Sequence, residues 1–252
     1  MFFSDTENSI KVGKKVIKDV YYFEENPMLD CNQFIIRDKS TGELALFDSG
    51  NGVSLNGLFV GMKNLGLDYR NITKVFLTHE HVDHVLGLYS LIKALKTNPP
   101  ELYAYGETAK ILREGAEAKI FPVNLGISPK MFGFEIVPLE VNSLNFDDLI
   151  NIGSEFTFQI YYTPGHSQGS VCYYESYKKI LIPGDLVFTG GSFGRYDFPG
   201  GSLDDLIESI KFVNNLDVNY LLPGHMGISD RGNAQIDYSY KMVQSIKSFF
   251  NP

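Results

Sequence analysis

The sequence has little cysteine and no long apolar run, and each shortage excludes a class of protein. Only 2 cysteines, Cys31 and Cys172, occur in 252 residues, which is too few for a disulfide framework. No run approaches the roughly 20 apolar residues of a membrane span. The first residues, MFFSDTENSIKVGKK, include acidic side chains and lack the apolar core of a signal peptide. We therefore expect reduced structural thiols, no membrane partner and a cytoplasmic location.

Basic charge is also scarce. The 22 Lys and Arg residues are outnumbered by 30 Asp and Glu, which gives a formal net charge of -8. Because phosphate binding needs clustered basic side chains, we expect no nucleic-acid partner. Hydrophobic residues make up 44% of the chain, as in an ordinary globular protein with a sizeable core.

Apolar strands alternate with helical segments along the chain, which predicts a layered α/β or α+β fold. We expect a single domain over residues 1–252, with its core at about 15–232 and a C-terminal helix at about 234–250. Residues 119–150 are expected to form loops and one or two strands. Strands are predicted at 44–50, 74–78, 101–106, 156–163, 170–176, 178–185 and 218–224, and further helices at about 83–96, at 107–118 and after Ser202.

All five histidines follow predicted strands. Three lie in the string HEHVDH, and the others close the strings TPGH and PGH. A carboxylate, Asp185, closes PGD in the same way. Because side chains at the carboxyl ends of neighbouring strands converge, ligands distant in sequence can meet there. The histidines are His79, His81, His84, His166 and His225.

The spacing within 79–84 favours two binding points. His79 and His81 are two residues apart in an extended loop, so both rings can point the same way. Asp83 and His84 open the next helix and can turn to a second point. Imidazole and carboxylate groups suit Zn, Fe, Mn or Co rather than Ca or Mg. Seven candidate ligands exceed the four of a tetrahedral zinc, which indicates two divalent ions, with zinc first and iron or manganese as alternatives. The alternative to metal binding is a chance cluster of surface histidines.

The string THEHVDH (78–84) resembles the metal motif of the metallo-β-lactamase superfamily. LFDSG (46–50), TPGHS (163–167), PGD (183–185) and PGH (223–225) are similar to its other motifs, in order. The resemblance implies a four-layer αββα sandwich with the metal site at the strand-end edge. It implies that one ion is held by His79, His81 and His166 and a second by Asp83, His84 and His225. It also implies that Asp185 bridges the two ions and that Asp48 holds the motif loop.

The loop GSFGRYDFPGG (191–201) is similar to that of glyoxalase II-like hydrolases, and also to that of persulfide dioxygenases. The similarity to the hydrolases implies hydrolysis of a small thioester or ester, such as an S-acyl glutathione-like substrate, by a metal-bridging hydroxide. Asp83 is the candidate catalytic residue, because besides serving as a metal ligand it could orient the attacking water. A thiolate with a pKa of roughly 8.5 leaves without a strong acid. Three alternatives stay open: a mononuclear iron sulfur oxygenase resembling persulfide dioxygenase, a lactonase, and a non-catalytic metal-binding scaffold.

Arg195 and Tyr196 are the candidate substrate-binding residues. A guanidinium can bind a carboxylate bidentately, but Arg195 could instead form a structural pair with Asp197. Tyr196 could line the pocket or pack on the surface. Glu80, between two ligands, is expected to be a solvated or helix-start carboxylate.

Overall fold

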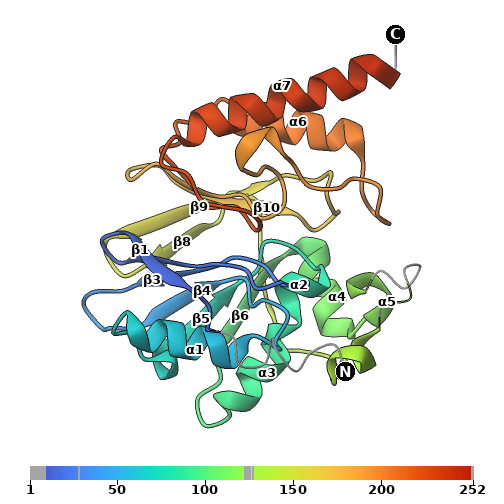
Figure 1. The fold of residues 1–252 in the computed structure, drawn as a ribbon. Coiled ribbons are helices and arrows are strands. Elements are labelled where there is room, and N and C mark those ends of the chain that lie inside the picture. The colour runs from blue at the N-terminus through green and yellow to red at the C-terminus, as the bar shows by residue number, and fades with distance from the viewer. Residues whose placement is uncertain (1–9, 28, 122–125, 127, 251–252) are drawn as a thin grey trace. The chain divides into compact units, whose positions relative to one another are not determined.

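The computed structural model describes residues 10–27, 29–121, 126 and 128–250 (Figure 1). Residues 1–9, on which the expectation of no signal peptide depends, lie outside this described part. The chain folds into two compact units. The first comprises Met1–Leu144 and Ile152–Glu155, and the second Asn145–Asn151 and Phe156–Pro252. Each unit has its own sheet and its own helices.

The first unit is built on a seven-stranded sheet whose strands lie side by side in chain order. Neighbours are antiparallel from β1 to β4 and parallel from β4 to β7. Because β4 and β5 are parallel neighbours, the residues that follow them leave the sheet at the same edge. The strands are β1 (Gly13–Ile17), β2 (Val20–Phe23), β3 (Gln33–Arg37), β4 (Leu44–Phe47), β5 (Ile72–Phe76), β6 (Glu101–Tyr105) and β7 (Asn142–Leu144).

Helices of the first unit pack against this sheet (Figure 1). Leu58, Leu91 and Leu112 come from three of these helices and share one buried core with Leu46 and Val75 of the sheet. Close packing of this kind gives the loops after β4 and β5 a rigid base. The helices are α1 (Leu55–Asn64), α2 (Val82–Val85), α3 (Gly87–Ala94), α4 (Gly106–Glu114) and α5 (Glu117–Ile120), with 3-10 turns η1 (Tyr69–Asn71) and η3 (Pro129–Phe132).

The helix predicted at about 83–96 is divided into α2 and α3 immediately before Gly87, the first residue of α3. The backbone of residues 49–50 passes against this point, and the Gly87 N–H donates to the Gly50 carbonyl at 2.8 Å. A Cβ at Gly87 would stand 1.9 Å from the Ser49 carbonyl oxygen. The approach of this distant segment requires glycine and diverts a backbone N–H from the helix, so the continuous helix is replaced by two short ones.

The second unit contains a five-stranded sheet in the order β12-β11-β10-β9-β8. Strand β10 is antiparallel to both β9 and β11, and β12 is parallel to β11. Strands β9, β11 and β12 therefore point the same way, and their carboxyl ends share one edge. The strands are β8 (Leu149–Ile152), β9 (Phe156–Tyr162), β10 (Val171–Glu175), β11 (Ile180–Ile182) and β12 (Tyr220–Leu221).

Two helices, α6 (Leu203–Val213) and α7 (Gly232–Phe250), cover one face of this second sheet (Figure 1). The predicted start of α6 is confirmed, because the Ser202 hydroxyl accepts a hydrogen bond from the Asp205 N–H at 3.3 Å. Ile210 and Ile236 of the helices pack with Leu181 of the sheet in a buried core. The 3-10 turn η4 (Thr189–Gly191) lies against α7 through a bond from the Gly190 N–H to the Gln235 side chain.

The mixed α/β class predicted from the sequence is confirmed by the two sheets with their helices. The four-layer stacking, the metal site at the strand-end edge and the single domain over 1–252 stay predictions. Residues 119–150, where they are described, contain the end of α5, η3, β7 and the start of β8. Among the described residues, no helix combines the length and the apolar character that crossing a membrane requires.

Candidate metal centre

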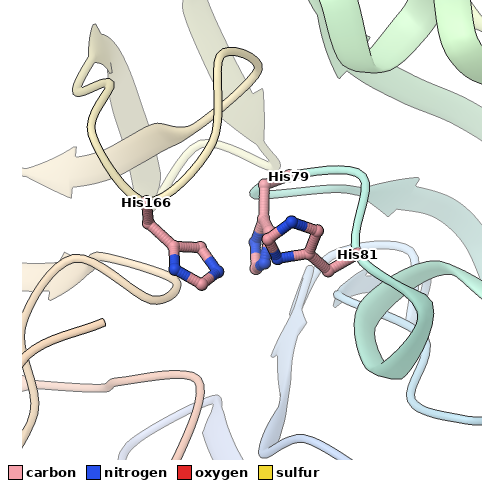
Figure 2. A group of neighbouring side chains, drawn as sticks. All are labelled: His79, His81 and His166. Atoms are coloured by element: carbon pink, nitrogen blue, oxygen red, sulfur yellow. The ribbon is translucent and has the colours of Figure 1, made fainter. Parts of the chain in front are cut away.

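The ligand motif of the first unit lies on the loop from β5 to α2. Residue 81 is still extended, with φ -68° and ψ 152°, and α2 begins at the next residue. Figure 2 shows His79 and His81 projecting from this loop. The ring centroids of His79 and His81 are 4.8 Å apart, and those of His79 and His84 are 4.1 Å apart. The first unit therefore gathers three imidazoles, and Asp83 Oδ2 lies 3.9 Å from His84 Nε2.

Asp48 fixes this loop from the end of the neighbouring strand β4. Its carboxylate accepts hydrogen bonds from the Thr78 N–H and the Thr78 hydroxyl, both at 2.8 Å, and contacts His84 Nδ1 at 2.9 Å. Its backbone is left-handed, with a φ of 56°. This conformation, which Asp tolerates better than most residues, turns the chain at the strand end.

These bonds also set which nitrogen of each ring carries a proton. An ionised carboxylate only accepts, so His84 Nδ1 is the donor to Asp48 and Nε2 keeps its lone pair. The Thr78 hydroxyl donates to Asp48, so at 3.0 Å it accepts from His79 Nδ1. His79 Nε2 therefore also keeps its lone pair. Both rings are oriented as metal ligands need to be.

Cys31 lies close to Asp48 and His84, with ligand-type atoms of all three within 4.8 Å of one another. Burial raises the pKa of the Cys31 thiol to about 11, although His84 acts in the opposite direction. The thiol is therefore protonated at neutral pH, and a protonated thiol is a poor metal ligand. Burial likewise raises the pKa of Cys172, in the second unit, to about 12. Both cysteines are free and buried, as expected of structural thiols.

The candidate ligands of the second unit follow β9, β11 and β12, the three strands whose carboxyl ends share one edge. Asp185 Oδ2 lies 3.5 Å from His166 Nε2 and 3.2 Å from His225 Nε2. A bond of 2.9 Å from the Gly224 N–H to the Gly184 carbonyl joins the turns that carry Asp185 and His225. One carboxylate oxygen thus stands between two imidazole nitrogens.

A backbone carbonyl orients His166, which Figure 2 shows on the loop after its strand. His166 Nδ1 is 2.6 Å from the Arg195 carbonyl oxygen. Because a carbonyl only accepts, Nδ1 carries the proton and Nε2 has the lone pair. Gly194 allows this contact, since a Cβ there would stand 1.9 Å from the Asp185 carbonyl oxygen and 3.0 Å from His166 Nδ1.

We expect Gly194→Ala to weaken metal binding by about tenfold, the lower end of the effect of losing a partner that orients a ligand. The new methyl group must push Asp185 or His166 away from its present position. Metal affinity measured by competition with a chelator tests this. Gly227→Ala is the matched control, because its Cβ would meet nothing within 4 Å. Equal affinities for the two variants would contradict the expectation.

The two candidate substrate residues have partners within the second unit. Arg195 forms a two-pronged pair with Asp197, at 2.9 and 2.7 Å, and its guanidinium lies 4.2 Å from the centre of the Phe198 ring. The structural pair considered from the sequence is therefore present. The side chain of Arg195 is 59% exposed. Tyr196 is half-buried and packs against the core of the second unit.

Two polar residues of the first unit have roles that sequence reasoning missed. The Thr78 hydroxyl links the carboxylate of Asp48 to the ring of His79 through two hydrogen bonds. In the sequence, only its position directly before the motif pointed to this role. Glu80 was expected to be a solvated or helix-start carboxylate, and the first alternative is wrong: its exposed fraction is 6%, and it accepts a hydrogen bond from the Thr108 hydroxyl at 2.8 Å. Thr108 is 28 residues away, so no local pattern could predict the contact.

The donors within each unit fit divalent transition metals. They are imidazole nitrogens and carboxylate oxygens, the set that zinc, iron and manganese accept. Two donors on one tetrahedral zinc, each at roughly 2.0–2.1 Å, stand about 3.3 Å apart. The distances from Asp185 Oδ2 to the nitrogens of His225 and His166, 3.2 and 3.5 Å, match this spacing.

Imidazole and carboxylate donors of this kind are the ligand types that metal-dependent hydrolases use. The sequence profile of the Metallo-beta-lactamase superfamily matches residues 27–225. The chain therefore belongs to that superfamily, and we assign it to the metallo-hydrolases.

Three known proteins illustrate the similarity. Hydroxyacylglutathione hydrolase GloC of Haemophilus influenzae is 32% identical over 141 residues, which cover 56% of this chain and 61% of GloC. Acyl-coenzyme A thioesterase MBLAC2 of Bos taurus is 30% identical over 156 residues, 59% of this chain and 54% of MBLAC2. This chain thus spans less than two thirds of either relative. The crystal structure of TTHA1623 in a di-iron-bound form is 28% identical, with a TM-score of 0.65 over 83% of this chain and 94% of that chain.

Proposed function

We propose that this chain hydrolyses a small thioester or ester, with two divalent metal ions as cofactors. The observation that carries the proposal is the position of Asp185 Oδ2, within 3.5 Å of imidazole nitrogens of both His166 and His225. A carboxylate oxygen between two ligand nitrogens suits a ligand that two ions share. The names of GloC and MBLAC2 support the thioester class, because each describes hydrolysis of a thioester.

In this proposal the ligands are those that the superfamily resemblance implies. One ion would be held by His79, His81 and His166 and the other by Asp83, His84 and His225, and Asp185 would contribute to both. Asp48 and the Arg195 carbonyl fix the proton on Nδ1 of His84 and His166, so that each Nε2 is available to an ion. Arg195 and Tyr196 remain the proposed substrate-binding residues.

Bound divalent ions would supply Lewis-acid polarisation of the acyl carbonyl and would lower the pKa of a water molecule. Asp83 is the proposed catalytic residue: its carboxylate accepts a hydrogen bond from the attacking water and orients it. No residue need protonate the leaving group, because a thiolate with a pKa of roughly 8.5 is stable enough to depart. The chain thus needs neither a serine nor a cysteine nucleophile.

The test combines metal analysis with a panel of substrates. Purified protein loaded with Zn²⁺, Fe²⁺ or Mn²⁺ is assayed on an S-acyl glutathione, an acyl-coenzyme A, a simple ester, a homoserine lactone and glutathione persulfide with oxygen. We expect two ions per chain and thioester turnover that falls at least about 100-fold in Asp83→Asn, as for loss of a group that acts on a proton.

The other outcomes separate the alternatives. Faster opening of the lactone would favour a lactonase. Oxygen uptake with the persulfide, one iron per chain and no thioester turnover would favour a sulfur oxygenase. Failure to bind metal, together with no measurable effect of His81→Ala, would overturn the enzymatic proposal and leave a scaffold.

A further inference from the structure

Glu80 is buried although it carries a charge and lies between two candidate ligands. Its exposed fraction is 6%, and that of Thr108, whose hydroxyl it binds at 2.8 Å, is 0%. Buried carboxylates are uncommon unless they are hydrogen-bonded. A specific contact therefore holds Glu80 in the interior of the first unit.

The Glu80 side chain and the two neighbouring imidazoles have different contacts. Successive side chains of an extended segment point to opposite sides. The rings of His79 and His81 lie 4.8 Å apart, whereas Glu80, between them in the chain, meets Thr108 in the first turn of α4. The N-terminal end of a helix favours a negative charge. Thr108 thus holds the residue that lies between the two imidazole-bearing residues.

The contacts of Asp48 hold the two ends of the loop, and that of Glu80 holds its centre. Asp48 binds residue 78 before it and residue 84 after it. The Thr108 hydroxyl binds the side chain of residue 80, and α4 is anchored in the core by Ile111 and Leu112. The contact therefore ties the middle of the motif to a rigid element.

We propose that the Glu80–Thr108 hydrogen bond is a positioning contact that sets the geometry of His79 and His81 and hence the affinity of the ion they bind. The consequence for metal affinity rests on the proposed function. The consequence for the loop itself does not, because it concerns the metal-free protein.

The test uses two variants of Thr108 that differ in one group. Thr108→Val has nearly the same shape without the hydroxyl, and Thr108→Ser keeps the hydroxyl. We expect Thr108→Val to weaken metal binding about tenfold, as for partners that orient ligands, and Thr108→Ser to stay within about twofold. In metal-free protein, amide hydrogen exchange of residues 78–82 should accelerate in Thr108→Val, while that of β5 stays unchanged.

Variants of Glu80 separate the hydrogen bond from the charge. Glu80→Gln keeps an oxygen that can accept from Thr108, whereas Glu80→Ala has none. We expect Glu80→Gln to bind metal nearly as the natural chain does and Glu80→Ala to match Thr108→Val. Equal losses in Glu80→Gln and Glu80→Ala, or exchange that Thr108→Val leaves unchanged, would overturn the proposal. If the natural chain bound no metal while the loop still loosened in Thr108→Val, the proposed function would fail and the positioning contact would stand.

Discussion

Asp48→Asn should bind metal about 100-fold more weakly than the natural chain while remaining folded, at the upper end for a partner that orients ligands. Asparagine tolerates the left-handed backbone of this position, so the change is confined to the carboxylate. If the amide oxygen of the new side chain keeps the bond to the Thr78 N–H, its NH2 group faces the Thr78 hydroxyl and His84 Nδ1. His84 Nδ1 must then accept, which moves the proton to Nε2, the nitrogen that the ion needs.

The measurement is competition with a chelator, with thermal unfolding as the check on folding. Asp237→Asn is the matched control, because this carboxylate is 45% exposed and pairs with Lys241 one turn further along α7. The control should bind metal as the natural chain does. If Asp48→Asn did so as well, Asp48 would not govern the protonation of His84.

Lys11→Met should lower the free energy of unfolding by about 3–5 kcal/mol, the usual effect of removing one partner of a buried ion pair. Lys11 Nζ lies 2.7 Å from Asp30 Oδ2, and both side chains are 0% exposed. Nζ also donates to the Gln33 side chain at 2.7 Å and to the Cys31 carbonyl at 2.9 Å. Methionine fills a similar volume but leaves the Asp30 charge buried without its cation.

Urea denaturation of metal-free protein measures this effect. Lys18→Met is the control, because Lys18 is 62% exposed and 3.9 Å from Glu155, a surface pair whose loss should change stability by less than about 1 kcal/mol. The double variant Lys11→Met with Asp30→Asn removes the stranded charge, so it should be less destabilised than the sum of the single changes. Strict additivity would mean that the two charges do not stabilise each other.

Strand positions could be predicted wherever an apolar run ended in a turn. All seven predicted strands are present, although several are shorter than the apolar runs, as at β12, which keeps only Tyr220–Leu221. The start of α6 was visible because Ser202 caps it within the local sequence. Local patterns thus sufficed where the structure depends on local contacts.

Features that depend on distant contacts could not be predicted. Helix α1 was not predicted, because Gly57 and Gly61 weaken its helical pattern. Glycine is required at position 61, since a Cβ there would stand 2.4 Å from the Lys11 carbonyl oxygen. The division at Gly87 follows from the approach of Ser49. Strands β1, β2 and β3 were not predicted either, and their pairing joins segments that only the folded sheet brings together.

In the candidate site, too, some features could be predicted from the sequence and others could not. The strand-end histidines and Asp185 were found from their spacing, and Asp48 from the family resemblance. The bond from the Thr108 hydroxyl to Glu80 and the bond from His166 to the Arg195 carbonyl were not found, because each joins residues at least 28 positions apart. Side chains that bear chemistry can be read from a motif, whereas the groups that orient them require the fold.

The left-handed backbone at Asp48 also restricts what evolution can sample at this position. One nucleotide change turns an aspartate codon into a codon for Asn, Gly, His, Tyr, Ala, Val or Glu. Asn, Gly and His readily adopt a φ near 56°, but none of them has a carboxylate. Glu keeps the carboxylate, but its side chain is one methylene group longer, and Glu disfavours the left-handed backbone conformation. Under selection for this site, no amino-acid substitution of Asp48 that one nucleotide change can produce should therefore be neutral.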